Sequence, residues 1–445
     1  MKKYPYLPHT EEDIKEMLKA IGVESIDDLF VDVPKTISPE KLNLPESMDE
    51  LTVRKIVEGL AKKNKFLNEM KVFLGAGIYY RYIPAVVYHM ASKPNFVTAY
   101  TPYQAEVSQG TLQALFEYQT MICELTGMEV TNASMYDGAS ALAEAMLMAV
   151  RISKKPKVLL SEAIHPEYKK TVETYVKPQG IEVEYFAYDK ETGQVDIEDL
   201  KKKLDDKVGG VAVAYPNFFG IVEDLKAIKG LLPEKVPFIV AADPIALAIL
   251  EPPAKFGADI VVGEGQALGN FPELGGPGFG FFSTNMKHVR TMPGRLIGKT
   301  KDVDGKTGYV MILQTREQHI RRSKATSNIC SNHAHSAVMA AIYMSTMGKE
   351  GLVEVAERSA KAAHYLAKRL EEKGFSLAFK GPFLFEFVFN AGQDYEEKWH
   401  KLAERGILGP LPLSRFYADM KDKALAATTE LTTKEDIEAL LEAIA

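Results

Sequence analysis

Hydrophobic positions follow two different spacings through the middle of the chain, and the change of spacing separates predicted strands from predicted helices. Short apolar runs indicate buried strands, whereas apolar residues three and four apart indicate helices. Strands alternating with helices predict an α/β fold whose mostly parallel sheet is covered on both faces. The expected strands are Lys157–Leu160, Ile181–Tyr188, Val211–Tyr215, Pro237–Ala242, Asp259–Val262 and Gly278–Ser283, with helices near Pro166–Val176, Ile197–Leu204 and Leu225–Leu232.

Two further helices precede this alternating region. Apolar positions from Leu112 to Cys123 share one helix face, and that helix is expected to end at Gly127. Gly138–Ile152 is apolar on almost every side, which is typical of a fully buried helix. A large α/β domain is therefore expected over residues 96–330.

The two ends of the chain have a different pattern. Residues 1–95 predict helices opening at Thr10 and within 47–50, interrupted by proline, in an extension that wraps over another surface and has no core of its own. Residues 331–445 predict a smaller α+β domain. Its expected elements are two long helices, His335–Met347 and Lys349–Glu372, strands at Phe375–Phe379, Phe383–Phe389 and Ala424–Thr429, and two later helices.

Composition narrows the possible functions. The 445 residues carry a formal net charge of −6, which argues against a general nucleic-acid binder. The two cysteines show no metal-ligand spacing, and His333 and His335 would point to different faces of a helix, so no metal site is expected. Because no apolar run approaches the roughly 20 residues that span a bilayer and no signal peptide is recognised, we expect a soluble, cytoplasmic protein without a membrane partner.

The stretch from Phe256 to Met286 is notable for a residue type that it lacks. It follows the predicted strand that ends before Asp243 and contains another strand and a glycine-rich loop, but no lysine or arginine. Large pyridoxal phosphate enzymes use this layout, with the aspartate on the pyridine nitrogen and a lysine after the next strand that binds the cofactor covalently. An aspartate that caps a turn explains Asp243 equally well. The loop without the amine predicts a protein shaped like a catalyst that cannot hold this cofactor covalently by itself.

A second candidate site opens the buried helix. Residues 136–140 supply backbone N–H groups, a glycine and a hydroxyl, so Gly138 and Ser140 suit a phosphate cradle. The simpler interpretation, which we favour, is that Asp137 caps the helix and Gly138 permits close packing.

Two loops rich in tyrosine precede the first core helix. Their hydroxyl and amide groups suit the orientation of a small polar substrate. Such clusters are equally typical of interfaces, and both interpretations hold if the site lies at an interface. One loop contains Tyr79 and Tyr80, and the other contains Tyr100, Thr101, Tyr103 and Gln104.

Residues 287–324 form a basic segment in an acidic chain. They include ten Lys or Arg and three acidic residues, a local excess of seven positive charges. This segment suits a phosphate, a carboxylate or an acidic protein, and a solvated basic loop is the usual alternative. His319 within it is either a titrating group or, more commonly, a structural histidine.

Two motifs connect these features to a known family. Tyr100–Gly110 (Tyr-Thr-Pro-Tyr-Gln-Ala-Glu-Val-Ser-Gln-Gly) and Arg316–Arg322, with Ala325–Cys330 after it, closely resemble the glycine decarboxylase P protein. The likeness covers essentially the whole chain. The family is glycine dehydrogenase (decarboxylating) of the glycine cleavage system, and its fold resembles the aspartate-aminotransferase-like, fold type I pyridoxal phosphate enzymes. The resemblance implies a mostly parallel sheet of the seven-stranded type.

In this family some organisms divide the protein into two subunits, and the cofactor-binding lysine belongs to the second. Its motif is of the type Gly-Ala-Asp-Val-x-His-x-Asn-x-His-Lys-Thr. Setting Gly257–Asp259 on this motif places Gln266 at the histidine before the lysine and Ala267 at the lysine itself. The resemblance is therefore to subunit 1, the α-type chain, which has no catalytic residue of its own.

The resemblance also implies partners and chemistry. With its β subunit (subunit 2), in a heterotetramer, the chain takes part in pyridoxal 5'-phosphate-dependent decarboxylation of glycine, with release of CO2. The aminomethyl group passes to the lipoyl group of the acidic H protein, and the cofactor is bound covalently by the partner. The alternatives are a self-sufficient enzyme with a displaced lysine, Lys255 or Lys287, and a catalytically silent scaffold for the β subunit.

The implied site residues form three groups. A degenerate cofactor pocket comprises Gly138, Ser140, Asp243 and Gln266. The wall of the partner's active site comprises Tyr79, Tyr80, Tyr100, Thr101, Tyr103, Gln104, Thr326, Ser327 and Asn328. Contacts to the H protein or to an anion comprise Arg316, His319, Arg321 and Arg322.

Overall fold

The computed structural model describes residues 6–34, 43–98, 100–273 and 276–444, and the chain divides into two units, Met1–Lys65 and Phe66–Ala445. In the first unit, α1 (Glu11–Ile21) begins with the expected capping box at Thr10, and α2 (Glu50–Ala61) begins after the cap Asp49. None of the described side chains in this unit is buried, so these residues form no core of their own.

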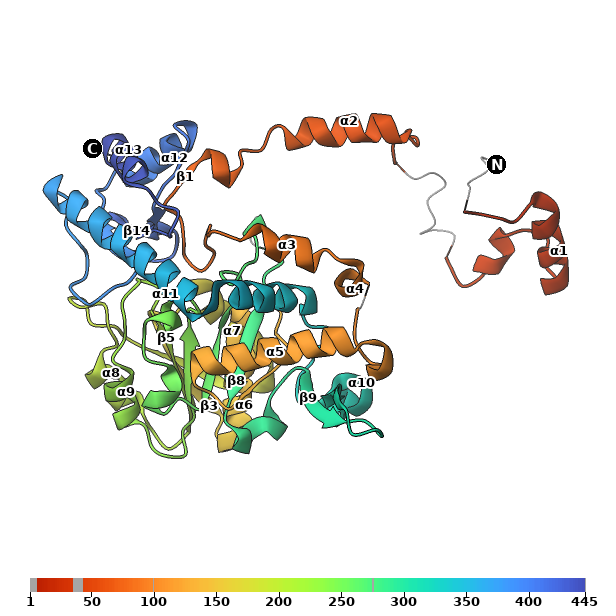
Figure 1. The fold of residues 1–445 in the computed structure, drawn as a ribbon, viewed down its shortest axis with the longest axis horizontal. Helices are drawn as coiled ribbons and strands as arrows, with labels where there is room; N and C mark the ends of the chain where they lie inside the picture. The colour runs from red at the N-terminus through yellow and green to blue at the C-terminus, as the bar shows by residue number, and fades with distance from the viewer. Residues whose placement is uncertain (1–5, 35–42, 99, 274–275, 445) are drawn as a thin grey trace. The chain divides into compact units, whose positions relative to one another are not determined.

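A seven-stranded sheet forms the centre of the second unit (Figure 1). Its strand order is β2-β8-β7-β6-β5-β3-β4, in which only β8 runs against its neighbours. The expected strands and the mostly parallel sheet are confirmed. The strands are β2 (Val130–Thr131), β3 (Lys157–Ser161), β4 (Glu182–Phe186), β5 (Val208–Tyr215), β6 (Phe238–Ala242), β7 (Ile260–Glu264) and β8 (Gly280–Thr284).

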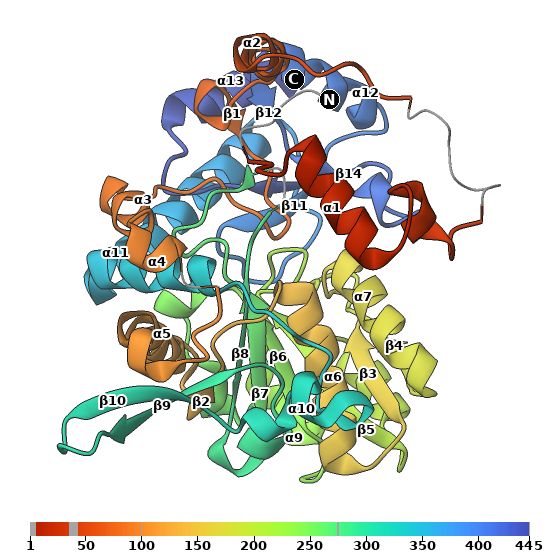
Figure 2. The same ribbon diagram turned by 90° about the vertical axis from the view of Figure 1, so that its right-hand side faces the viewer.

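Helices cover both faces of this sheet (Figure 2). Successive strand residues point to opposite faces, so Val240 packs into the core beneath α5 while Ile239 and Ala241 pack beneath α6. Because both faces are buried, the strands are apolar along most of their length. One face carries α6 (Gly138–Ser153) and α7 (Pro166–Val176), and the other carries α5 (Gln109–Thr126), α8 (Ile197–Lys203), α9 (Leu225–Leu231) and the first half of α11 (Ala334–Glu372).

The C-terminal part forms a smaller layer around an antiparallel sheet of order β11-β14-β13. The second half of α11, which follows a break at Gly348, packs on this sheet together with the last two helices. The segment just after Phe66 joins it, because β1 pairs with β12. The elements are β1 (Lys71–Val72), β11 (Glu386–Asn390), β12 (Ile407–Leu408), β13 (Leu411–Pro412), β14 (Lys423–Ala427), α12 (Tyr395–Glu404) and α13 (Lys434–Ile444).

One expected strand and one alternative interpretation need correction. The strand predicted at Phe375–Phe379 is wrong, because only Leu377 forms an isolated bridge with β11, and the N–H groups of Lys380 and Gly381 bind carbonyls of a large-domain loop. The basic segment is also more ordered than a loop. It contains the hairpin of β9 (Leu296–Lys301) and β10 (Thr307–Ile312), followed by α10 (Gln318–Arg321).

The remaining short helices, α3 (Ala85–Ala91) and α4 (Pro94–Val97), lie between β1 and α5. Within the described part of the chain, no helix combines the length and apolarity needed to cross a bilayer. The carboxyl ends of β3, β5, β6 and β7 meet at one edge of the sheet. The strand that follows β3 lies on one side of it and the strands that follow β5 lie on the other, so the connections change direction between β3 and β5. Open α/β sheets bind ligands at such an edge.

Candidate functional site

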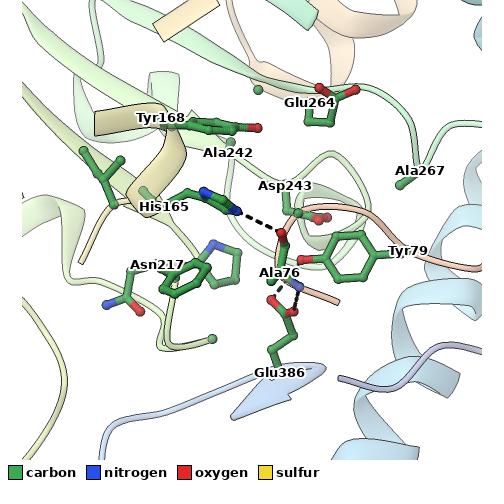
Figure 3. Close-up of a pocket in the computed structure, with 18 of the residues that line it drawn as sticks. Ala76, Tyr79, His165, Tyr168, Asn217, Ala242, Asp243, Glu264, Ala267 and Glu386 are labelled. Carbon is green, nitrogen blue, oxygen red and sulfur yellow. Dashed lines mark hydrogen bonds between the residues drawn. The ribbon is translucent and has the colours of Figure 1, made fainter. Parts of the chain in front are cut away.

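A narrow pocket of about 90 Å³ lies at this edge of the sheet (Figure 3). Its lining comes from the ends of β5, β6 and β7, from the start of α7, from residues 76–79, and from Glu386 at the start of β11. The smaller layer therefore helps to close it. Pockets for organic ligands are usually about 300–1,000 Å³, so this pocket is small for an organic ligand.

The segment Gly75–Tyr79, here called the plug segment, is held across the pocket by Glu386. The N–H of Ala76 donates to Glu386 Oε1 at 2.7 Å, and the Tyr79 hydroxyl donates to Oε2 at 2.9 Å. Ala76 has a φ of +58°, a strained conformation for a residue with a Cβ. Its carbonyl lies 2.9 Å from Nε2 of His165 on the opposite wall.

Gln266 fastens the other end of the plug segment. Its Oε1 accepts the Tyr79 N–H at 2.9 Å, while its Nε2 donates to the Tyr79 carbonyl at 3.1 Å and to the Asn270 carbonyl at 2.7 Å. The amide therefore pairs with both backbone groups of one residue. Ala267, which follows it, adds only a methyl group to the lining.

Asp243 follows β6 and caps the turn after it. Its Oδ1 accepts the N–H groups of Ile245 at 2.8 Å and Ala246 at 2.9 Å, so the turn-capping interpretation is confirmed. The carboxylate also lines the pocket, where burial raises its pKa and the guanidinium of Arg81 partly opposes that rise. A role beside a pyridine nitrogen stays a prediction.

Glu264 ends β7 and binds the start of α6. Its Oε2 accepts the Gly138 N–H at 2.9 Å, and its Oε1 accepts the N–H groups of Gln266 at 3.1 Å and Phe279 at 3.2 Å. Burial raises the pKa of Glu264 to about 7 despite these three donors. Burial likewise raises the pKa of Glu386 to about 7.

The favoured interpretation of the start of α6 is also confirmed. Asp137 accepts the Ser140 N–H at 2.7 Å, and the Ser140 hydroxyl binds back to Asp137 in a capping box. A Cβ at Gly138 would collide with the Tyr168 hydroxyl and lie 2.8 Å from the Glu264 nitrogen.

These residues do not fit pyridoxal phosphate in this chain. Among the described residues that line the pocket there is no lysine or arginine, but there are three carboxylates, Asp243, Glu264 and Glu386. The helix start that suits a phosphate is bound by Glu264. The described residues also contain no group of three or more His, Cys, Asp or Glu placed to hold a metal ion.

A second set of polar residues surrounds Arg295, which is only 4% exposed. Its guanidinium donates to the Tyr103 hydroxyl at 3.0 Å, to Thr101 Oγ1 at 3.2 Å and to Asn332 Oδ1 at 3.4 Å. Glu317 completes this Arg295 cluster with an ion pair at 3.4 Å. The cluster therefore supports the second tyrosine loop from beneath.

Of the residues expected at a partner's active site, some are buried within this chain and others are exposed on its surface. Tyr79 is 7% exposed and belongs to the chain's own pocket, because its hydroxyl and its backbone are bound there. Tyr100 and Tyr103 are 80% and 52% exposed. Tyr80 is half-buried, Gln104 and Asn328 are exposed, Thr326 is half-buried, and Ser327 donates to Glu144 on α6 at 2.7 Å.

The basic segment also turns two of its arginines inward. Arg295 supports the cluster, and Arg316 donates to the carbonyls of Met292, Gly294 and Leu313, so its donors hold the backbone together. His319 packs edge-on against Tyr103 with its Nδ1 3.6 Å from Glu317. Arg321 and Arg322 are exposed.

Several site residues were not singled out by sequence. The sequence did contain a signal for Glu264, because this acidic residue lies at the end of a predicted strand, just before the loop that lacks lysine. Glu386 had none, because its partner Ala76 lies 310 positions away. His165, Tyr168 and Arg295 were likewise missed.

Comparison with known proteins agrees with this architecture. Residues 4–444 match the family model described as glycine cleavage system P-protein. The chain is 57% identical over 441 residues to a probable glycine dehydrogenase (decarboxylating) subunit 1 of Thermotoga maritima, covering 99% of each. A crystal structure of glycine decarboxylase (P-protein) of the glycine cleavage system, in inhibitor-bound form, is 43% identical with a TM-score of 0.89 and 99% of each chain covered.

The fold extends to more distant enzymes. Glutamate decarboxylase of Lactobacillus brevis is 15% identical, with a TM-score of 0.68 over 92% of this chain and 95% of that one. The fold class expected from the sequence, that of the fold type I pyridoxal phosphate enzymes, is confirmed.

The buried Glu386 predicts a specific pH dependence of stability. Its pKa is about 7 in the folded chain and 4.5 in its ordinary state, so between these values the folded state keeps a proton that the unfolded state has lost. Rising pH through this window therefore lowers the free energy of unfolding. We expect the variant Glu386→Gln to gain stability relative to the unchanged chain between about pH 5 and about pH 7.5, measured by denaturant unfolding.

Glu350→Gln is the matched control, because Glu350 is exposed on α11 and the substitution removes the same charge. Parallel pH profiles for Glu386→Gln and the unchanged chain would contradict the prediction.

Proposed function

The chain belongs to the glycine cleavage system P-protein family, and we propose that it is the subunit that lacks the cofactor-binding lysine and completes the active site of a second, lysine-bearing subunit. Its relatives of the same length are subunits of a decarboxylating glycine dehydrogenase. The observation that carries the proposal is Ala267 at the lysine position, in a pocket whose described lining offers no amine.

The alternative in which a displaced lysine of this chain binds the cofactor is not supported. Lys255 is 66% exposed and pairs with Glu251 at 2.7 Å, and Lys287 is 65% exposed and lies 3.6 Å from Asp259. Neither belongs to the described lining of the pocket. A lysine that binds a cofactor must reach into the pocket with its amine free, and these two are committed at the surface.

The contribution of this chain is a surface that shapes the partner's site. Arg295 fixes Thr101 and Tyr103 from below, and the Tyr100 hydroxyl lies 2.5 Å from Ser331 Oγ. The exposed tyrosine rings offer apolar area with polar tips, which suits an interface that excludes water. A loop held by a buried guanidinium keeps such groups in place at little further entropic loss on binding.

The cofactor, pyridoxal 5'-phosphate, is held by the partner in this proposal and supplies the electron sink for loss of CO2 from glycine. The lipoylated H protein then receives the aminomethyl group. The exposed Arg321 and Arg322 are candidates for its docking, since an acidic protein is attracted by outward-facing cations. Arg316 is not, because its donors are bound to backbone carbonyls.

Mixing the two subunits tests the proposal. Glycine–bicarbonate exchange is expected only when this chain is combined with the lysine-bearing subunit, and each chain alone is expected to remain near background. Exchange by this chain alone, or covalent labelling of it by pyridoxal phosphate and borohydride, would refute the assignment.

The proposed wall of the partner's active site is tested by Tyr103→Phe, which removes the hydroxyl that Arg295 binds. We expect kcat of the mixed enzyme to fall about tenfold, since a hydrogen bond to a charged group positions the loop. Assembly, measured by size-exclusion chromatography, should be unchanged. Tyr88→Phe is the control, as Tyr88 is 61% exposed on α3. An unchanged kcat would favour the scaffold alternative.

The double variant Arg321→Glu/Arg322→Glu tests the docking of the H protein. We expect KM for the H protein to rise about tenfold at low salt and the effect to shrink at high salt, because the attraction is screened. The control is the pair Lys201→Glu/Lys202→Glu, because both lysines are exposed on α8 and the substitutions change the net charge by the same amount. This pair should leave KM for the H protein unchanged. Equal KM values for the two double variants would remove Arg321 and Arg322 from the docking surface.

A further inference from the structure

The absence of a lysine is only one of two features that separate this pocket from a cofactor site. The other is the carboxylate of Glu264, which accepts N–H groups from the start of α6, from the loop after β7 and from Phe279 just before β8. Converging backbone donors at a helix start are the arrangement that binds a phosphate in many proteins. Here a side chain of the protein itself takes those donors.

The carboxylate is tightly enclosed where it sits. A Cβ placed on Gly278 would lie 2.6 Å from Glu264 Oε1, and a Cβ on Gly138 would collide with the Tyr168 hydroxyl. The two glycines therefore bring backbone against Glu264 at distances that no larger residue allows. A phosphate group would have to displace this carboxylate to reach the Gly138 N–H.

Electrostatics oppose a phosphate as well. Asp243 and Glu386 line the same 90 Å³ pocket as Glu264. The guanidinium of Arg81, which opposes the rise in the pKa of Asp243, is paired with Glu430 at 2.9 Å, and both side chains of that pair are buried. A doubly charged phosphate would thus lie beside a carboxylate with no free cation in the described lining.

We propose that the Glu264 carboxyl group is a built-in hydrogen-bond acceptor that occupies the phosphate position at the start of α6, and that it excludes phosphorylated ligands from this pocket independently of the missing lysine. The pocket retains a latent phosphate site, and removal of one carboxylate exposes it. This inference concerns the pocket of the single chain, so it stands or falls separately from the proposed role in the partner's active site.

The test introduces a lysine at position 267, first with Glu264 kept and then with Glu264 replaced. Ala267→Lys alone is expected to remain unlabelled when the purified chain is treated with pyridoxal phosphate and then with borohydride. Ala267→Lys/Glu264→Ala is expected to be labelled at position 267, at least about tenfold more, because the group that takes the backbone donors of the phosphate position has been removed. Peptide mass spectrometry measures the label and its position, without any need for catalysis.

The matched control is Ala267→Lys/Glu251→Ala, which removes a carboxylate at the surface instead. Full labelling of Ala267→Lys alone would overturn the proposal. Labelling of Ala267→Lys/Glu264→Ala no stronger than that of this control would overturn it too.

A second measurement needs no added lysine. Glu264→Ala is expected to gain thermal stability with inorganic phosphate and with pyridoxal phosphate, whereas the unchanged chain gains none and pyridoxal without phosphate stabilises neither. If Glu264→Ala does not fold, Glu264→Ser is measured in its place. A folded variant at position 264 that shows no phosphate-dependent stabilisation would overturn the proposal.

Discussion

The carboxylate of Glu386 is the contact on which the arrangement of the pocket depends. It extends from β11 in the smaller layer and binds Ala76 and Tyr79, which lie against the edge of the large sheet. The approach is close, because a Cβ on Gly75 would collide with Glu386 Oε1 and a Cβ on Gly220 would collide with its backbone carbonyl. One side chain thus joins the plug segment to both layers, and it holds Ala76 in a conformation that the residue alone would avoid.

The polar residues of this chain fall into two groups that differ in how their hydrogen bonds are satisfied. In the pocket, Gln266 and Glu264 bind backbone groups, and Glu386 binds the Ala76 N–H and the Tyr79 hydroxyl, so they serve the fold of the chain itself. Around Arg295, the buried ends are bound while the rings of Tyr100 and Tyr103 remain largely exposed. The polar groups of the pocket are therefore satisfied within the chain, whereas the tyrosine rings near Arg295 remain exposed on a loop that the buried guanidinium holds.

The sequence predicted the large sheet well because both of its faces are buried, which makes apolar runs such as Phe238–Ala242 easy to recognise. It could not predict how side chains point in loops. Tyr79 and Tyr100 stand in similar tyrosine-rich loops, yet one is buried and the other almost fully exposed. Counting charges over residues 287–324 gave the correct sum but not the direction of Arg295 and Arg316, which turn inward. The missing lysine at Ala267 was visible, whereas the carboxylate that takes the phosphate position depends on a contact between Glu264 and Gly138, 126 residues apart.

The edge of the sheet at which open α/β folds bind ligands is filled in this chain by its own side chains. Here Tyr79, Tyr168 and the plug segment line a space of about 90 Å³. Glu264 satisfies backbone donors at the helix start that would otherwise be buried without a partner. Placing carboxylates in this pocket is itself unfavourable, because burial raises the pKa of Glu264 and of Glu386 to about 7. The chain's own side chains thus fill the pocket, and the charged forms of two buried carboxyl groups are disfavoured there.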